Sequence, residues 1–177
     1  MFQLFKDEKI AVPAKIVAVY LLWKLFYFFA DQDGTALGIV WDKLVLSIST
    51  AYANATGAVL HMIGMRAKVE TIYVYLTDSG KSIAVLEHCC AIPACVIFVA
   101  CIATFKGTLT EKLWFIPLGL AGIVFINLTR LVFLCWVMAN QPAAMFAMHH
   151  SVITVGFTYG LILLMIMWWM KRHTSNA

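Results

Sequence analysis

Two adjacent thiols, Cys89 and Cys90, stand at the start of an apolar run that extends to Phe105. Glu87 and His88 precede them directly, so several ionisable groups gather at one end of an expected helix. A cysteine attacks as the thiolate, and a nearby cation lowers the pKa of its thiol into the working range. In a membrane, ionisable groups at a helix end are costly enough to indicate a functional site by default. The stretch therefore suggests a cysteine nucleophile.

Two later stretches supply the groups that such a nucleophile needs. Asn127 and Arg130 lie three positions apart in one apolar run, and His149 and His150 directly precede another. A histidine can act as general base and then as general acid. An arginine can hold an oxyanion or a carboxylate with paired donors. Together these residue types suit acyl transfer through a thioester. The alternative is that Arg130 is a cation at the membrane interface and the histidines are loop residues.

The composition indicates that lipid is the solvent of this chain. Of its 177 residues, 63% are hydrophobic and only 12% are charged, whereas a soluble domain carries about a quarter charged residues. We expect one integral membrane domain over residues 1–177. The net charge of +4 comes with no basic stripe interleaved with aromatics, so nucleic acid is not an expected partner.

The five cysteines show neither a CxxC pair nor zinc-ligand spacing with histidine, so the sequence predicts no metal and no cofactor. Three of them lie inside apolar runs, where free cysteine behaves as a small hydrophobe: Cys95, Cys101 and Cys135.

Four apolar runs are expected to cross the membrane: Ile10 or Ile16 to Ala30, Cys89 to Phe105, Leu113 to about Met138, and Ser151 to Met170. The tail of residues 1–9 is basic, which predicts a cytoplasmic N-terminus and puts Asp31 and Asp33 outside. By the same tendency the later basic positions are cytoplasmic: Lys106, Lys112, Lys171 and Arg172.

Two further segments are not expected to cross. Residues 37–65 have one apolar and one polar helical face, which favours a helix lying in the outer interface; a true span is the alternative. Residues 68–86 contain two β-rich runs around Asp78-Ser79-Gly80, which predicts a short hairpin. Open strands cannot lie in lipid, so this hairpin must be extracytoplasmic. The fold expected is an all-α polytopic membrane protein with four spans, an interfacial helix and a hairpin.

This topology brings the reactive groups to one level. Cys89 begins its helix on the outer side. Arg130 lies 17 residues after Leu113, which at about 1.5 Å per residue is roughly 25 Å into a core about 30 Å thick. His149 and His150 precede the last span, again on the outer side. Residues 86–172 would therefore hold the catalytic helices.

The ordered set of Glu87-His88-Cys89-Cys90-Ala91, Asn127-Leu128-Thr129-Arg130 and His149-His150 resembles the exosortase/archaeosortase family over roughly residues 15–170. That family carries a Cys in a Glu-x-Cys-Ser-Gly-like motif, an Arg in an Asn-x-x-Arg motif and a downstream His. Cys90-Ala91 stands where the family has Ser-Gly, and the chain is shorter than the eight-span members.

The resemblance implies a membrane-embedded, sortase-like cysteine transpeptidase that acts without a cofactor. Cys89 would be the nucleophile, Arg130 the stabiliser and His150 the acid/base, while Cys90 competes with Cys89 and His149 with His150. Glu87 and Asn127 are supporting candidates, and His88 is expected at the edge of the hairpin.

The substrates that the resemblance implies are exported proteins with a C-terminal tail of short motif, apolar helix and basic cluster. The enzyme would lie in the inner (cytoplasmic) membrane, with its site facing the extracytoplasmic side. Two other functions stay open. One is a membrane thiol–disulfide oxidoreductase using Cys89 and Cys90, and the other is a non-catalytic export or assembly subunit.

Overall fold

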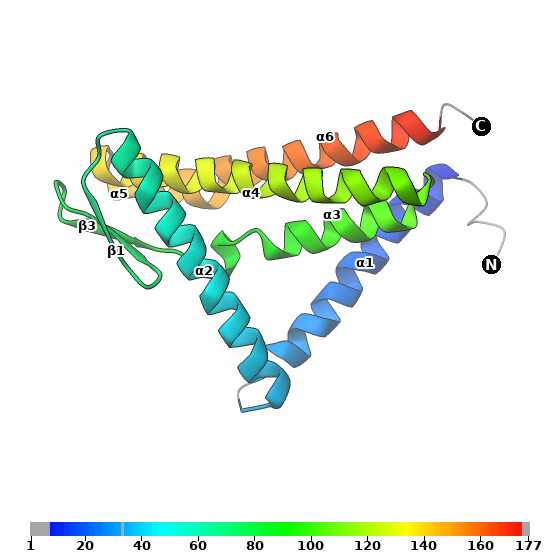
Figure 1. Cartoon of the computed structure of the whole chain (residues 1–177), viewed down its shortest axis with the longest axis horizontal. Helices are drawn as coiled ribbons and strands as arrows, with labels where there is room; N and C mark the ends of the chain where they lie inside the picture. Colours follow the sequence, from blue (N-terminus) through cyan, green and yellow to red (C-terminus); the bar gives the residue numbers. More distant parts are fainter. Residues whose placement is uncertain (1–7, 33, 175–177) are drawn as a thin grey trace.

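The computed structural model describes residues 8–32 and 34–174 (Figure 1). The predicted cytoplasmic tail, up to residue 7, and Asp33 therefore lie outside the described residues. The elements in chain order are α1 (Glu8–Ala30), α2 (Ala36–Met62), β1 (Ala67–Glu70), β2 (Tyr73–Leu76), β3 (Lys81–Ala84), the 3₁₀ turn η2 (Glu87–Cys89), α3 (Ile92–Thr104), α4 (Leu109–Asn140), α5 (Ala143–Met148), the π-helical turn η3 (His149–Ile153) and α6 (Thr154–Thr174).

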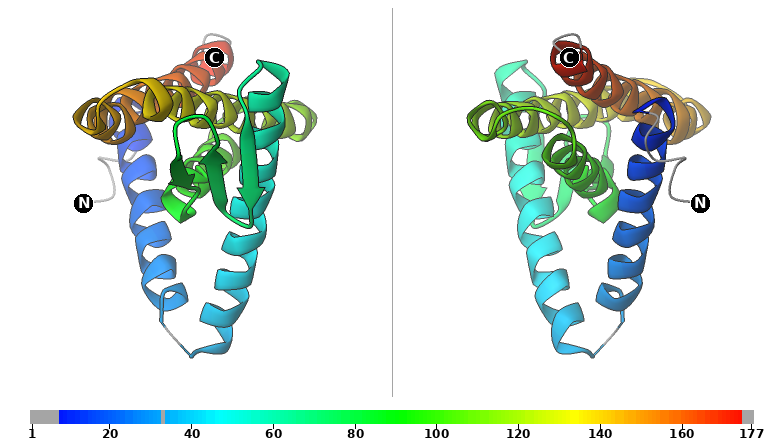
Figure 2. Two further views of the ribbon diagram at one scale, coloured as in Figure 1. Left: turned by 90° about the vertical axis from the view of Figure 1, so that its left-hand side faces the viewer. Right: turned by 90° about the vertical axis from the view of Figure 1, so that its right-hand side faces the viewer.

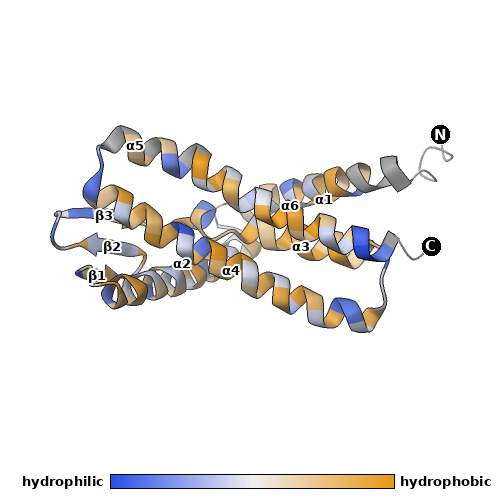
Figure 3. Ribbon diagram, turned by 90° about the horizontal axis from the view of Figure 1, so that it is seen from above, coloured by the Kyte–Doolittle hydropathy of each residue, from blue (hydrophilic) through white to orange (hydrophobic). Residues whose placement is uncertain are grey.

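Helices α3, α4 and α6 run side by side and form the centre of the molecule (Figures 1 and 3). Their shared core is fully apolar and includes Phe98, Ile123 and Trp169. Gly119 lets α4 approach α3 closely, because a Cβ at this position would overlap the ring of Phe98. Helix α1 packs against α3, and α2 packs against α4 and the sheet.

Large apolar side chains cover the outside of the helices. Leu113, Phe125 and Phe157 are 66%, 71% and 65% exposed, respectively. A soluble monomer rarely exposes apolar surface on this scale. Within residues 8–32 and 34–174, three helices are long and apolar enough to cross a membrane, namely α2, α4 and residues 154–173 of α6, while α3 is a shorter apolar helix. The chain is therefore a polytopic, mostly helical membrane protein, as the composition predicted.

The two ends of the bundle differ in character. The start of α1, the connection between α3 and α4, and the C-terminus lie at one end, and the sheet and α5 lie at the other (Figures 1 and 3). The basic positions Lys106, Lys112 and Lys171 thus belong to the end opposite the sheet. This is the separation that the charge pattern predicted.

Helices α1 and α2 form a V that stands oblique to the bundle and closes at their connection (Figure 2). Together they lead the chain from the basic end to the sheet end of the bundle. The length and composition of α2 suit a span. Its placement in the outer interface stays a prediction.

The segment predicted as a hairpin is an antiparallel sheet of three strands in the order β1-β2-β3. The turn at Asp78-Ser79-Gly80 joins β2 to β3 as expected, but the run from Lys68 to Leu76 is two strands rather than one. Thr71 adopts a left-handed conformation with φ of 55°, which reverses the chain within that run. On β2, Val74 and Leu76 face the core and are buried.

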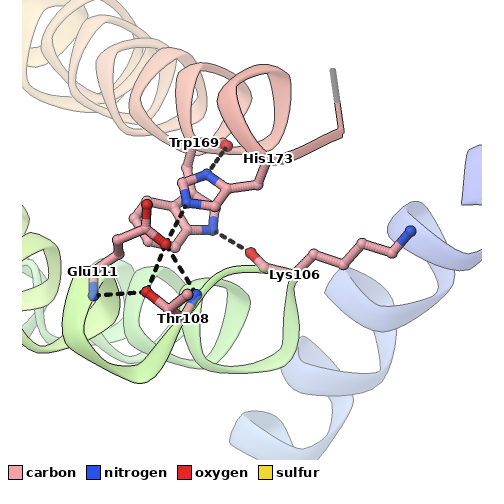
Figure 4. Close-up of polar contacts among 5 residues, drawn as sticks. All are labelled: Lys106, Thr108, Glu111, Trp169 and His173. Atoms are coloured by element: carbon pink, nitrogen blue, oxygen red, sulfur yellow. Dashed lines mark hydrogen bonds and ion pairs between the residues drawn. The ribbon is translucent and has the colours of Figure 1, made fainter. Parts of the chain in front are cut away.

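A group of polar contacts joins the start of α4 to the end of α6 at the basic end (Figure 4). Thr108 and Glu111 form a reciprocal cap on the first turn of α4. The Trp169 indole donates a hydrogen bond of 3.2 Å to the Lys106 carbonyl, and the His173 ring stacks on Trp169 at 4.1 Å. His173 Nε2 lies 3.2 Å from Glu111 Oε2. These contacts hold the connection between α3 and α4 in place, at the end of the bundle far from the thiols.

Candidate active site

The thiols sit on a sharp change of direction between the sheet and α3. The chain leaves β3, makes the 3₁₀ turn η2, and reverses at Ala91, whose φ of 54° is left-handed. Pro93 follows in the first turn of α3, where a missing N–H costs nothing. This arrangement leaves Cys89 outside α3, at its N-terminal end, with its side chain 2% exposed.

Helix α4 contacts the Cys89 backbone through Asn127. Asn127 is fully buried, and its Nδ2 donates a hydrogen bond of 2.7 Å to the carbonyl of Cys89. Arg130 lies one turn later on the same face of α4 and is 9% exposed. Its Nε donates to Thr154 Oγ1 at 3.0 Å, and its Nη2 donates to the His150 carbonyl at 3.3 Å. The guanidinium thus joins α4 to the start of α6.

The histidines lie on the π-helical turn η3, which no pattern in the sequence predicted. A π turn widens the helix and is frequent at functional sites. His150 Nε2 lies 3.7 Å from Cys89 Sγ, within reach of a thiol–imidazole hydrogen bond. Thr154 Oγ1 donates to the His149 carbonyl at 2.7 Å, so Thr154 stabilises both this turn and Arg130. No pattern in the sequence indicated that Thr154 would contact both groups.

Cys90 and His149, the alternatives to Cys89 and His150, make contacts outside the Cys89–His150 pair. Cys90 Sγ lies 3.2 Å from Ser49 Oγ on α2 and donates to the Leu86 carbonyl at 3.4 Å. The ring of His149 meets Phe133 edge-on at 5.3 Å, and its buried Nδ1 has no hydrogen-bond partner among the described residues. Cys89 and His150 are therefore the thiol and imidazole that face each other.

Glu87 and His88, the residues before the thiols, take different positions. Glu87 Oε2 accepts a hydrogen bond of 3.2 Å from the Tyr27 hydroxyl on α1, and this contact ties the turn to the first helix. His88 is exposed, and its ring meets the ring of His150 edge-on at 5.8 Å. It lies beside the reactive pair on η2 rather than on the edge of the sheet, where it was expected.

A cavity of about 280 Å³ opens beside these groups. Arg130, His150 and Asn127 line it together with residues of α3, α6 and η2: His88, Ala91, Ala94, Val155, Thr158 and Tyr159. Cys89 is buried and is not among the residues that line the cavity.

Burial sets the resting protonation of the pair. It raises the pKa of the Cys89 thiol, although the nearby Arg130 charge and the Leu86 backbone contact oppose the shift. Burial also lowers the pKa of His150, and the Arg130 and His88 charges add to that effect. At neutral pH the pair is therefore a thiol beside a neutral imidazole rather than an ion pair. In that state His150 can accept a proton.

Comparisons with known proteins identify the family of the chain. No curated protein and no solved structure matched it. The family model described as transmembrane exosortase matches residues 16–169. That match covers most of the chain, including Cys89, Arg130, His150 and every helix of the bundle except the ends of α1 and α6. The chain belongs to the transmembrane exosortase family.

Proposed function

We propose that the chain is a membrane-embedded cysteine peptidase and transpeptidase that cleaves exported proteins through a thioester acyl-enzyme. The observation that carries the proposal is the 3.7 Å contact between Cys89 Sγ and His150 Nε2, with Arg130 bound to the carbonyl of the same histidine. Membership of the exosortase family supports an enzyme of this type in the membrane.

In the proposed acylation step, Cys89 Sγ attacks the scissile carbonyl carbon as its proton passes to His150 Nε2. The carbonyl oxygen gains the negative charge, which Arg130 is suited to hold. Among the described residues, two of its N–H groups are bound to protein, and the guanidinium has five N–H donors in all; Arg130 also lines the cavity. His150 then protonates the amine as the C–N bond breaks, which leaves the thioester on Cys89.

In the second step an acceptor attacks the thioester carbonyl and transfers its proton to His150, and the thiol is regenerated. The acceptor is an amine in transpeptidation and water in hydrolysis. Asn127 is a positioning residue in this scheme, because its hydrogen bond fixes the backbone carbonyl of Cys89 and hence the direction of the sulfur.

The proposed substrates are exported proteins with a C-terminal sorting tail of short motif, apolar helix and basic cluster. Such a helix would lie parallel to the bundle in the bilayer, and its motif would reach the site on the extracytoplasmic side. The location of the site toward the sheet end, opposite the basic end, supports this orientation under the positive-inside tendency.

The test is cleavage of a tailed substrate by single variants in membranes. We expect Cys89→Ala to abolish cleavage, and His150→Ala to lower its rate by about 10²–10⁴-fold, the range for loss of a general acid–base. Arg130→Ala should lower it by about 10²–10³-fold, as for loss of an oxyanion donor. Cys90→Ala and His149→Gln are the matched controls, and both should still process the substrate.

Each competing explanation gives a different result. If Cys90→Ala abolishes cleavage while Cys89→Ala retains it, the assigned nucleophile is wrong. A requirement for both thiols would favour the thiol–disulfide oxidoreductase. Full function of Cys89→Ala in the cell would indicate a non-catalytic export or assembly subunit.

A further inference from the structure

A third side chain faces the Cys89–His150 pair, and the proposed mechanism gives it no task. One ligand atom from each of His88, Cys89 and His150 lies within 4.8 Å of the other two. Within the described part of the chain, no other group of His, Cys, Asp or Glu side chains has this arrangement. The sequence predicted no metal because ligand spacing was absent. This group instead combines two neighbouring residues with a third from a distant turn.

We propose that His88, Cys89 and His150 bind a divalent transition-metal ion, with Zn²⁺ as the ion of best fit, and that the ion inhibits the enzyme by occupying its nucleophile. The inhibition rests on the proposed function, whereas the binding does not.

The distances suit a tetrahedral ion. Zinc holds sulfur at about 2.3 Å and nitrogen at about 2.0–2.1 Å, so a bound sulfur and nitrogen lie roughly 3.5 Å apart. Cys89 Sγ and His150 Nε2 are already 3.7 Å apart. His88 is exposed, so its ring can turn toward the other two without disturbing the core. Of the three ligands, His88 and His150 line the adjoining cavity, so a water that completes the coordination would enter from their side.

The ligand types select the ion. A thiolate and two imidazoles suit zinc and related transition metals, while Mg²⁺ and Ca²⁺ require oxygen ligands. As the Zn–S bond forms, the Cys89 thiol releases its proton to the buffer, and both histidines bind as neutral imidazoles. The sulfur can then no longer attack, and His150 can no longer accept a proton.

The charge of Arg130 sets a limit on the affinity. Arg130 is close enough to influence both Cys89 and His150 electrostatically, and its positive charge opposes a second cation. The site also has three protein ligands rather than the four of a structural zinc site. We therefore expect reversible binding that a chelator removes, which is the behaviour required of an inhibitor.

The experiment is a Co²⁺ titration of the purified, chelator-stripped protein, followed by Zn²⁺ competition. Co²⁺ bound to a thiolate gives a charge-transfer absorption band. We expect one ion per chain with this band in the wild type, and no band in Cys89→Ser. His88→Gln should weaken binding by more than about 100-fold, since loss of even an outer partner of a ligand costs about 10–100-fold. His61→Gln and Cys90→Ser change the same residue types outside the group and should bind like the wild type.

Absence of the band from the wild type, or unchanged affinity in His88→Gln, would overturn the site. Substrate cleavage then tests the inhibition. Zn²⁺ should inhibit the wild type, and His88→Gln should need a correspondingly higher Zn²⁺ concentration to lose half of the activity that it shows in EDTA. If Zn²⁺ binds but cleavage continues, the inhibition is wrong and the site stands. If no substrate is cleaved under any condition, the proposed function fails, and the Co²⁺ titration still decides the binding.

Discussion

At the scale of single residues, burial determines the chemistry of the proposed catalytic pair. Cys89 is enclosed to 2% exposure, and the same enclosure raises the pKa of its thiol and lowers that of His150. A cysteine peptidase can instead hold a ready thiolate beside an imidazolium. In the proposed mechanism the proton therefore moves during attack, and His150 acts as a base and not only as a charge.

The pH profile follows from these shifts. Only the neutral form of His150 can accept the thiol proton, so cleavage is lost as pH falls through the pKa of His150. Because burial and the Arg130 charge lower that pKa below the ordinary histidine value of about 6.5, the acid limb of kcat/KM should lie below that pH. The measurement is kcat/KM against pH in EDTA. An acid limb at or above that pH would contradict a buried neutral base.

Thr154 gives a second prediction at this scale, because its hydroxyl joins Arg130 Nε to the His149 carbonyl. Thr154→Val keeps the shape but removes both hydrogen bonds, so the guanidinium loses its orientation. We expect kcat to fall by at least about 10-fold, equivalent to the loss of one hydrogen bond to a charged group. Thr154→Ser should restore activity. Thr129→Val, which removes an exposed hydroxyl on α4, should change nothing. Equal activity of Thr154→Val and the wild type would show that the Thr154 hydroxyl does not orient Arg130 for catalysis.

At the scale of elements, the turn between η2 and α3 explains why the family motif has glycine where this chain has Ala91. The backbone there has a φ of 54°, a conformation that glycine adopts without strain and that costs other residues about 1–2 kcal/mol. The strain lies two residues after Cys89, the proposed nucleophile. The departure from the motif at this position is therefore a cost in stability rather than a change of chemistry.

Replacing Ala91 by glycine should therefore stabilise the protein. We expect Ala91→Gly to raise the free energy of unfolding in detergent by about 1 kcal/mol, after the extra entropy of the unfolded glycine is deducted. Ala94→Gly, one turn into α3, is the control and should lower it by about 1 kcal/mol, because glycine weakens a helix interior. A loss of stability in both variants would show that the turn does not strain Ala91.

The elements show where sequence reasoning succeeds and where it stops. Long apolar runs identify α4 and α6, since nothing but a buried or membrane helix accommodates them. The sheet was predicted one strand short, because the reversal at Thr71 uses neither glycine nor proline. The π turn at His149–Ile153 carries no sequence mark at all. Its carbonyls accept a local hydrogen bond from Thr154 and a second one from Arg130 on α4, and the second exists only once the helices have packed.

At the scale of the whole molecule, the charge pattern predicted the separation of the basic end from the sheet end, and with it the meeting of Cys89, Arg130 and His150. It could not predict the V that α1 and α2 form, because a tilt depends on packing rather than on hydropathy (Figure 2). It also could not choose between neighbouring side chains such as Cys89 and Cys90. Their directions depend on the turn at Ala91.

The orientation gives a prediction for the intact membrane. Thr77 on the β2–β3 turn and Lys171 near the end of α6 are both exposed, at opposite ends of the bundle. A membrane-impermeant thiol reagent should label Thr77→Cys from outside intact spheroplasts, and label Lys171→Cys only after lysis. The wild type is the control for the native thiols. The reverse pattern would place the proposed site on the cytoplasmic side.

The central claim is that Cys89 carries the acyl group during cleavage, and peptide mass spectrometry of the acid-quenched enzyme–substrate mixture tests it most directly. The account predicts the N-terminal part of the substrate attached to Cys89 as a hydroxylamine-sensitive thioester. An acyl group on Cys90, or full cleavage by Cys89→Ala with no adduct on the chain, would contradict it.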